Sequence, residues 1–275
     1  MNSKSARFSF LNRLTMPSAW LACLLLLGLG NAKADEFTLA ISLGLSPQQA
    51  ERVYQPVVRY LSQATGQRVR LATSANALAH WQLMRRESYD LVLDGPAFTD
   101  YRAEKMNYRV IAKMPDVLSF TLVAHADLML FEPNELIGRT IATQPSPSLG
   151  ALRLARIFDN PMRQPDQLQT DTHQQAAEAV LSGRAAGAML PSPLVANYPN
   201  LTGIYTSEQV PAPGFSVSER VSPELEEAFR RALLDAHNSE AGRAMLEALN
   251  ITHFEAADHA TYQGLETMLE GLWGY

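Results

Sequence analysis

Cysteine is almost absent from this sequence: Cys23 is the single example in the whole chain. It lies in the apolar run "AWLACLLLLGLG" within the leader segment 1–34. A chain that lost this segment would contain no cysteine, which excludes disulfide bonds and thiol catalysis. A cysteine-free protein suits an oxidising compartment outside the cytoplasm.

Recognisable catalytic motifs are also missing. The sequence contains no Gly-x-Ser-x-Gly, no His-Glu-x-x-His and no phosphate-loop Gly-Lys-Ser/Thr. Its six histidines do not follow the spacing of metal ligands. We therefore predict that the protein is not an enzyme and has neither a metal nor a cofactor.

Positive charge is scarce after position 34, where 19 Lys and Arg stand against 28 Asp and Glu, a net charge of −9. Such a balance argues against nucleic acid or an anionic membrane surface as the main partner. A small anion is not excluded, because local geometry captures it rather than the field of the whole protein. The chain that follows the leader is long enough to form one large domain or two modest lobes.

The leader segment 1–34 has the pattern of a secretory signal peptide. Lys4, Arg7 and Arg13 form a basic start, the apolar run follows, and an Ala-x-Ala site precedes Asp35. The run is short for a membrane-spanning helix, which needs about 20 residues. We expect cleavage after Ala34 and a periplasmic location; the alternative is an uncleaved anchor.

Strand and helix patterns alternate through the first part of the remaining chain. Two helices are predicted, at 47–66 and 77–86, among strands at 36–44, 67–73, 89–97, 108–114 and 119–125. This βαβαβ order predicts a mostly parallel sheet with right-handed crossovers. Ligands bind outside the carboxyl ends of such strands, so Ser42, Asn76 and the 94–99 turn are candidate positions. Asp94 is either an ordinary turn residue or, facing a ligand, a group that would favour an amine.

A second unit begins near position 126. The stretch "ATQPSPSLG" (142–150) precedes an apolar, basic helix, and its backbone N–H groups either bind an anion or cap that helix. In "DTHQQAAEAVLSG" (171–183), Thr172 and Gln175 predict a capping box. After 210–215 the pattern is helical to the end, with Ser222 as the cap of a helix and Pro223 at its first position. We expect a first lobe made of 35–124 plus 216–275 and a second lobe made of 125–215, with hinges near 121–126 and 210–217.

These landmarks, in this order, resemble the periplasmic phosphate/phosphite/phosphonate-binding proteins of ABC transporters. The resemblance covers nearly the whole chain after the leader and rests on "YQPVVRYLSQATGQRVRL", "YDLVLDGPAF", "ELIGRTIATQPSPSLG", "THQQAAEAVLSGRAAGAML" and "SEAGRAMLEALN". It implies a type II periplasmic-binding fold. In that fold, two α/β lobes, each a mostly parallel sheet flanked by helices, are joined by two hinge strands.

The resemblance also implies a ligand site. Ser146 and Ser148 match positions whose hydroxyls hold the oxyanion, and His173 matches the family histidine. Other family positions differ: serines are replaced by Pro147 and Leu149, and tyrosines by Thr99 and by Asn76 or Ala77. Proline removes a backbone donor, so we read the stretch as an inherited anion site altered for a different or weaker ligand. The candidate ligand-binding residues are Ser148, Ser146, His173, Thr99, Asp94, Asn76 and Ser42.

We therefore expect a monomeric solute-binding protein that captures a small anionic or zwitterionic molecule between its lobes and delivers it to an ABC permease. One alternative is a sensor that signals to a membrane receptor such as a histidine kinase. A more remote alternative is an enzyme on the same fold.

Overall fold

The computed structural model describes residues 36–41, 47–74, 77–86 and 89–272. The described residues belong to one compact unit. The predicted signal peptide therefore lies outside the described residues, as do Ser42 and Asn76. None of the helices in the described part is long and apolar enough to cross a membrane.

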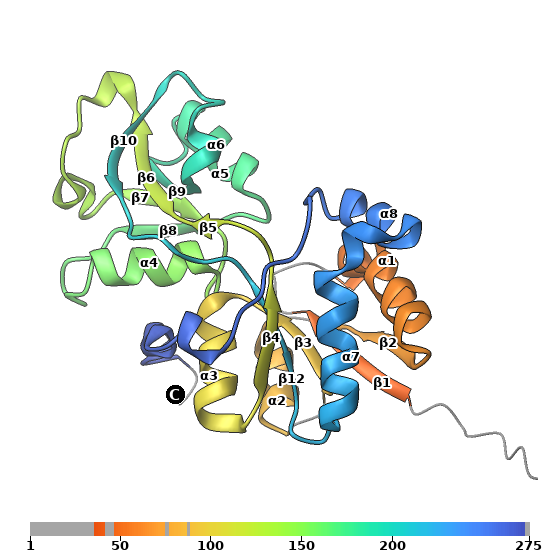
Figure 1. Cartoon of the computed structure of the whole chain (residues 1–275). Helices are drawn as coiled ribbons and strands as arrows, with labels where there is room; N and C mark the ends of the chain where they lie inside the picture. Colours follow the sequence, from red (N-terminus) through yellow and green to blue (C-terminus); the bar gives the residue numbers. More distant parts are fainter. Residues whose placement is uncertain (1–35, 42–46, 75–76, 87–88, 273–275) are drawn as a thin grey trace, which may run out of the picture. The chain divides into compact units, whose positions relative to one another are not determined.

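The first sheet has five strands in the order β2-β1-β3-β12-β4 (Figure 1). β1 pairs in parallel with β2 and β3, whereas β12 runs antiparallel to β3 and β4. The strands are β1 (Glu36–Ile41), β2 (Arg68–Ala72), β3 (Leu91–Asp94), β4 (Arg109–Lys113) and β12 (Gly214–Val217). The helices in the two segments that contain these strands or follow them are α1 (Pro47–Thr65), α2 (Ala77–Arg85), α3 (Pro96–Met106), α7 (Pro223–Leu234) and α8 (Glu240–Ala248).

The second sheet also has five strands, in the order β10-β6-β9-β7-β8. β7 pairs in parallel with β8 and β9, and β6 runs antiparallel to β9 and β10. The strands are β6 (Phe120–His125), β7 (Thr140–Thr143), β8 (Asp166–Gln169), β9 (Gly187–Pro191) and β10 (Leu201–Thr206). Its helices are α4 (Leu149–Ile157), α5 (His173–Leu181) and the short α6 (Ser192–Val195). The predicted α/β class is confirmed, and each sheet contains both parallel and antiparallel pairs.

The chain passes between the sheets through two short strands that pair with each other. β5 (Val117–Leu118) is antiparallel to β11 (Val210–Pro211). The predicted crossing at 121–126, with a boundary at position 124, is wrong, because β6 pairs with β9 and β10 inside the second sheet. The boundary expected at 215 also falls inside a strand, β12 of the first sheet.

Two elements, the helix α3 and the strand β12, differ from the sequence prediction, and the burial of polar residues explains both differences. The turn predicted at 94–99 is wrong, because Pro96 is the first residue of α3. This helix buries the polar residues Thr99, Asp100 and Arg102. Its buried face is therefore partly polar, and the sequence does not show the apolar periodicity that predicts a helix. β12 is only four residues long and buries the polar Ser216 with its apolar residues, so it is too short a pattern to stand out in the sequence.

The helix starts follow the predicted chemistry with one difference. Ser222 Oγ accepts a hydrogen bond from the Leu225 N–H, and Pro223 is the first residue of α7. Thr172 Oγ1 accepts from the Gln175 N–H at the start of α5. The predicted capping box is wrong in its reciprocal bond, because Gln175 Oε1 accepts from the N–H of Asp171 rather than from that of Thr172.

The sequence pattern predicted a helical chain from here to the end. After α8, however, the described chain is not regularly helical. It continues as two 3₁₀ turns, η4 (His259–Thr261) and η5 (Leu265–Leu269), which lie near α3 (Figure 1). Between them Tyr262 is fully buried, and its hydroxyl donates to the Ala212 carbonyl at 2.7 Å. The C-terminal segment is therefore anchored on the first sheet by buried contacts.

Candidate anion-binding site

The carboxyl ends of β7 and β8 lie side by side, and each leads into a helix. Thr143 ends β7, and its carbonyl accepts a hydrogen bond from the Thr170 N–H at 3.0 Å. In the following loops, Gln144 Nε2 donates to the Asp171 carbonyl at 3.0 Å. These contacts hold the approaches to α4 and α5 together at one edge of the second sheet.

Three buried polar atoms at this edge have no hydrogen-bond partner among the described residues. They are Thr143 Oγ1, Thr170 Oγ1 and His173 Nδ1. Thr143 is 1% exposed. A buried hydroxyl without a partner costs about 1–3 kcal/mol, so a ligand that bonded to these atoms would recover free energy that the chain alone does not.

The start of α4 contributes backbone donors and a capping serine. Ser148 Oγ accepts from the Ala151 N–H at 3.3 Å and donates to the Gln144 carbonyl at 3.1 Å. The Ser148 N–H donates to the Pro145 carbonyl at 3.0 Å, so it is engaged within the chain. The N–H groups of Leu149 and Gly150 belong to the first turn, where no helix carbonyl can accept them.

Phe120 connects the starts of α4 and α5. A Cβ atom on Gly150 would lie 3.1 Å from Phe120 Cε1, so α4 approaches this ring closely. The same ring meets His173 edge-on, with 5.7 Å between the ring centroids. Both helix N-termini therefore converge on one side chain, and each carries a partial positive charge.

His173 has an environment that favours the neutral imidazole. Burial lowers the pKa of His173 below its ordinary value. A bound anion would oppose the effect of burial and favour the protonated ring.

The β3–α3 junction holds the other predicted site residues, and here the polar groups are used internally. Asp94 and Arg102 are both fully buried and form an ion pair, with His80 Nε2 3.7 Å from the Asp94 carboxylate. Thr99 is 0% exposed, and its Oγ1 is 3.1 Å from the Asp94 carbonyl and 3.2 Å from that of Gly95. These contacts give Asp94 and Thr99 structural roles and speak against their contact with a ligand.

An apolar cluster lies against the start of α4. The Trp81 ring is 6.0 Å from that of Phe98 and 5.2 Å from that of Tyr101. Leu152 belongs to this cluster, and Leu149 packs against it. The side chain of Leu149 thus makes an apolar contact at the start of α4.

Ser148 and His173 lie at the converging helix starts, whereas Ser146 is exposed and precedes the cap. Thr143, Thr170 and Phe120 were missed. The signal for the threonines was weak: each closes a short strand pattern shortly before a helix start.

Two α/β sheets connected by the paired strands β5 and β11 define the type II periplasmic-binding fold. Within that fold the chain belongs to the family described as "ABC transporter, phosphonate, periplasmic substrate-binding protein", whose model matches residues 39–262. This is a family of periplasmic substrate-binding components of ABC importers rather than of enzymes. Comparison with curated proteins gave no match.

Solved structures of similar fold include phosphonate-binding proteins. PhnD1 from Prochlorococcus marinus, in complex with methylphosphonate, has a TM-score of 0.70 and 14% identity, covering 85% of this chain and 97% of that one. A binding protein component of an ABC phosphonate transporter from Pseudomonas aeruginosa has a TM-score of 0.67 and 17% identity, over 86% and 85% of the two chains. XAC2383 from Xanthomonas citri bound to ATP has a TM-score of 0.70 and 15% identity, covering 85% of this chain and 95% of that one. At these identities the likeness shows the fold.

Proposed function

We propose that this protein captures a small phosphonate-like anion at the shared edge of β7 and β8 and delivers it to an ABC permease. The observation that carries the proposal is the set of buried polar atoms without partners in the described chain, Thr143 Oγ1, Thr170 Oγ1 and His173 Nδ1, beside two converging helix starts. Family membership supports it, because the matched family is that of the phosphonate importers.

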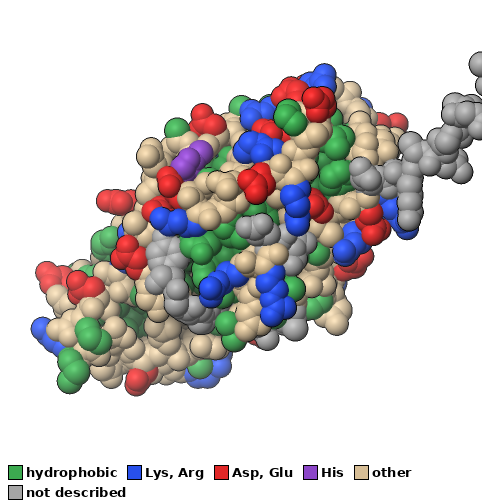
Figure 2. Space-filling model, turned by 90° about the horizontal axis from the view of Figure 1, so that it is seen from below, with side chains coloured by type: hydrophobic (Ala, Val, Ile, Leu, Met, Phe, Trp, Pro, Cys, Tyr) green, Lys and Arg blue, Asp and Glu red, His purple; other side chains and the backbone are tan. Residues whose placement is uncertain are grey.

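The chemistry of the site suits an anion held by dipoles. Both threonine hydroxyls can donate, as can the N–H groups of Leu149 and Gly150, and helix N-termini bind anions in this manner. The nearest basic residue of α4 is engaged elsewhere, since Arg153 Nη2 donates to the Glu208 carbonyl at 3.1 Å. Figure 2 shows basic and acidic side chains interspersed on one face rather than gathered by sign. Local donors, not a broad positive field, would select the ligand.

Leu149 and Pro147 narrow the choice of anion. Pro147 has no N–H to donate, and Leu149 joins the apolar cluster that contains Leu152. Each lost hydrogen bond to a charged group costs about 1.5–3 kcal/mol. An alkylphosphonate, with one fewer oxygen than phosphate and an apolar group in its place, matches this mixed surface better than inorganic phosphate does.

The test is a ligand panel measured by thermal shift and isothermal titration calorimetry. Phosphate, phosphite, methylphosphonate, 2-aminoethylphosphonate, methanesulfonate and glutamate would be compared. A ligand at 100 times its Kd stabilises the folded state by about 2.7 kcal/mol, a rise in Tm of roughly 5–10 °C for a chain of this size. Methylphosphonate should give the largest rise. No response to any phosphorus oxyanion would overturn the proposal.

Delivery to a permease requires a change of state on binding. The pair β5–β11 is the described connection between the two sheets that would act as the hinge, allowing them to close as two lobes. Small-angle scattering with and without methylphosphonate should show a smaller radius of gyration in the bound form.

Export to the periplasm predicts that the protein recovered from that compartment begins at Asp35, which N-terminal sequencing would check.

A further inference from the structure

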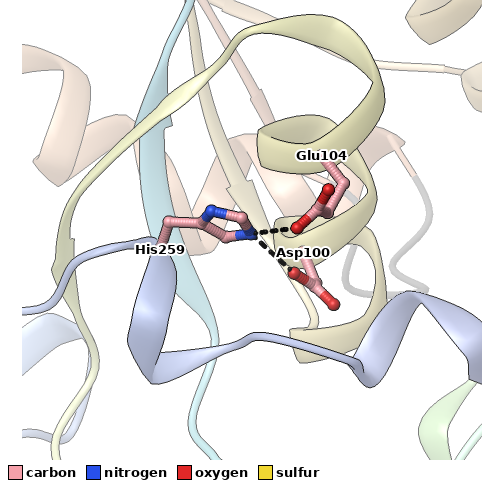
Figure 3. Close-up of side chains that lie close together, drawn as sticks. All are labelled: Asp100, Glu104 and His259. Atoms are coloured by element: carbon pink, nitrogen blue, oxygen red, sulfur yellow. Dashed lines mark hydrogen bonds and ion pairs between the residues drawn. The ribbon is translucent and has the colours of Figure 1, made fainter.

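A second cluster of chemical groups lies on α3, away from the proposed anion site. Asp100 and Glu104 stand at i and i+4 and therefore share one face of this helix. His259 of η4 points between them (Figure 3). His259 Nε2 lies 3.0 Å from Asp100 Oδ1 and 3.2 Å from Glu104 Oε1. The three ligand-type atoms all lie within 4.8 Å of one another.

The cluster carries more negative charge than one imidazole can balance. A third carboxyl group, Glu266, adjoins it, and the Glu266 N–H donates to Asp100 Oδ2 at 2.9 Å. Glu266 Oε2 is buried, and no described residue bonds to it. Two carboxylates thus meet one imidazole, with a third carboxyl group beside Asp100, an arrangement that a further positive charge would balance.

We propose that Asp100, Glu104 and His259 form a site for a divalent transition-metal cation, best matched by Zn²⁺. Two carboxylate oxygens and one imidazole nitrogen are ligands that Zn²⁺ accepts, and three protein ligands leave a fourth position for water. Mg²⁺ and Ca²⁺ prefer sites built from oxygen alone. Ligand atoms about 2.0–2.2 Å from a tetrahedral zinc lie roughly 3.3–3.6 Å apart, so the distances of 3.0 and 3.2 Å from His259 Nε2 to the two carboxylates need to widen slightly.

Burial gives the site a fixed base and an open side. The Asp100 side chain is 0% exposed, and its second oxygen is held by the Glu266 N–H. The side chains of His259 and Glu104 are 40% and 35% exposed. A hydrogen-bonded ligand of this kind orients the metal, and the exposed pair provides the entry path that a metal site requires.

Metal binding here would fasten the C-terminal segment to the body of the protein. His259 comes from that segment and both carboxylates come from α3. Beyond the cluster, η5 reaches α4, since Arg156 Nη2 donates to Thr267 Oγ1 at 2.9 Å. Met268 and Leu269 of η5 also share an apolar cluster with Leu152 of α4. The metal would therefore stabilise contacts between α3, the C-terminal segment and α4.

The experiment is a zinc titration of the full chain after treatment with a chelator, in a protein without a histidine tag. Calorimetry should show one Zn²⁺ site, and Mg²⁺ and Ca²⁺ should not compete for it. His259→Ala and Glu104→Gln should each weaken zinc binding by at least about tenfold. His237→Ala is the matched control, because His237 is exposed and lies outside the cluster; its affinity should equal that of the original chain.

Thermal unfolding gives the second measurement. Saturating Zn²⁺ should raise the Tm of the original chain and of His237→Ala, and leave His259→Ala unchanged. Both substituted side chains are partly exposed, so both variants should fold, and far-ultraviolet circular dichroism would verify this. Absence of zinc binding, or binding that persists unchanged in both His259→Ala and Glu104→Gln, would overturn the proposal. The titration needs no phosphonate, so its result is independent of the proposed function.

Discussion

The junctions β3–α3 and β7–α4 look alike in sequence and differ in chemistry. Both follow a short buried strand, contain a proline and lead into a helix. At β3–α3 the charge of Asp94 is paired with Arg102 inside the protein. At β7–α4 the buried hydroxyl of Thr143 meets no partner in the described chain. A junction that satisfies its own charge supports the fold, whereas one that leaves buried donors unmatched is suited to hold a ligand.

Burial explains why the two junctions divide the work in this way. Arg102 is fully buried, and its guanidinium lies 5.0 Å from the ring centroid of Tyr108 and 5.9 Å from that of Tyr89. Its neighbours are thus two tyrosine rings, the His80 imidazole and one carboxylate, which together enclose the charge. Charged groups enclosed in this way are costly to disturb.

The largest effect is expected on breaking the buried ion pair. Arg102→Met leaves the Asp94 carboxylate without its charged partner, and the loss of one member of a buried pair costs about 3–5 kcal/mol. Urea unfolding should show a decrease of that size in the free energy of unfolding. Arg156→Met, an exposed change on α4, should cost far less.

The double variant Asp94→Asn/Arg102→Met sharpens this test. It removes both charges, so its free energy of unfolding should decrease less than that of Arg102→Met alone. A loss below about 1 kcal/mol in the single variant would show that the ion pair does not support the β3–α3 junction.

A matched pair of threonine substitutions compares the two junctions directly. Thr99→Val removes a hydroxyl that donates to nearby carbonyls and should lower the free energy of unfolding by about 1 kcal/mol, without affecting methylphosphonate binding. Thr143→Val removes a buried hydroxyl that has no partner in the described chain. It should leave stability unchanged or raise it.

The same pair separates stability from binding. Calorimetry should show that Thr143→Val weakens methylphosphonate binding by about 10- to 100-fold, since a hydrogen bond to a charged group contributes about 1.5–3 kcal/mol. Unchanged affinity in Thr143→Val, with reduced affinity in Thr99→Val, would place the ligand at the β3–α3 junction instead.

The smallest effect concerns the pH dependence of stability at His173. Its pKa is lowered in the folded state from an ordinary 6.5, so below pH 6.5 the unfolded chain binds more protons there than the folded one. The contribution to stability is therefore complete above pH 6.5 and is lost as pH falls below it. His173→Gln should remove this contribution, which urea unfolding at pH 7.5 and 5.5 would measure.

The exposed His237 supplies the control for that experiment. His237→Gln should keep the pH dependence of the original chain. Methylphosphonate should reduce the dependence in the original chain, because an anion beside the ring favours the imidazolium form. A pH dependence that is identical in the original chain and in His173→Gln would show that His173 does not titrate as proposed.

Local chemistry explains what could be predicted of the fold. The helix α1 ends at Thr65, directly before Gly66, which is the last residue of the predicted helix 47–66 and has a positive φ of 69°. Ser222 and Pro223 begin α7 as expected, and Ser148 caps α4. Each of these signals involves residues close together in the chain, where periodicity and capping apply.

The candidate sites depended on contacts that no local pattern contains. Thr143 and Thr170 meet because β7 and β8 are parallel neighbours in register. Asp100 and His259 are 159 positions apart and meet because the C-terminal segment lies against α3. Asp94 was a reasonable site candidate until the structure paired it with Arg102.

The sequence by itself determined the α/β class, the principal helices and their caps, and the family, because these follow from hydrophobic periodicity and from short motifs in a fixed order. Tertiary structure alone decided which polar groups are satisfied within the described part of the protein. Asp94 and Thr99 found partners there, whereas Thr143 Oγ1 and His173 Nδ1 did not. Burial and hydrogen bonding depend on neighbours far apart in the chain, so they emerge only when strands and helices pack.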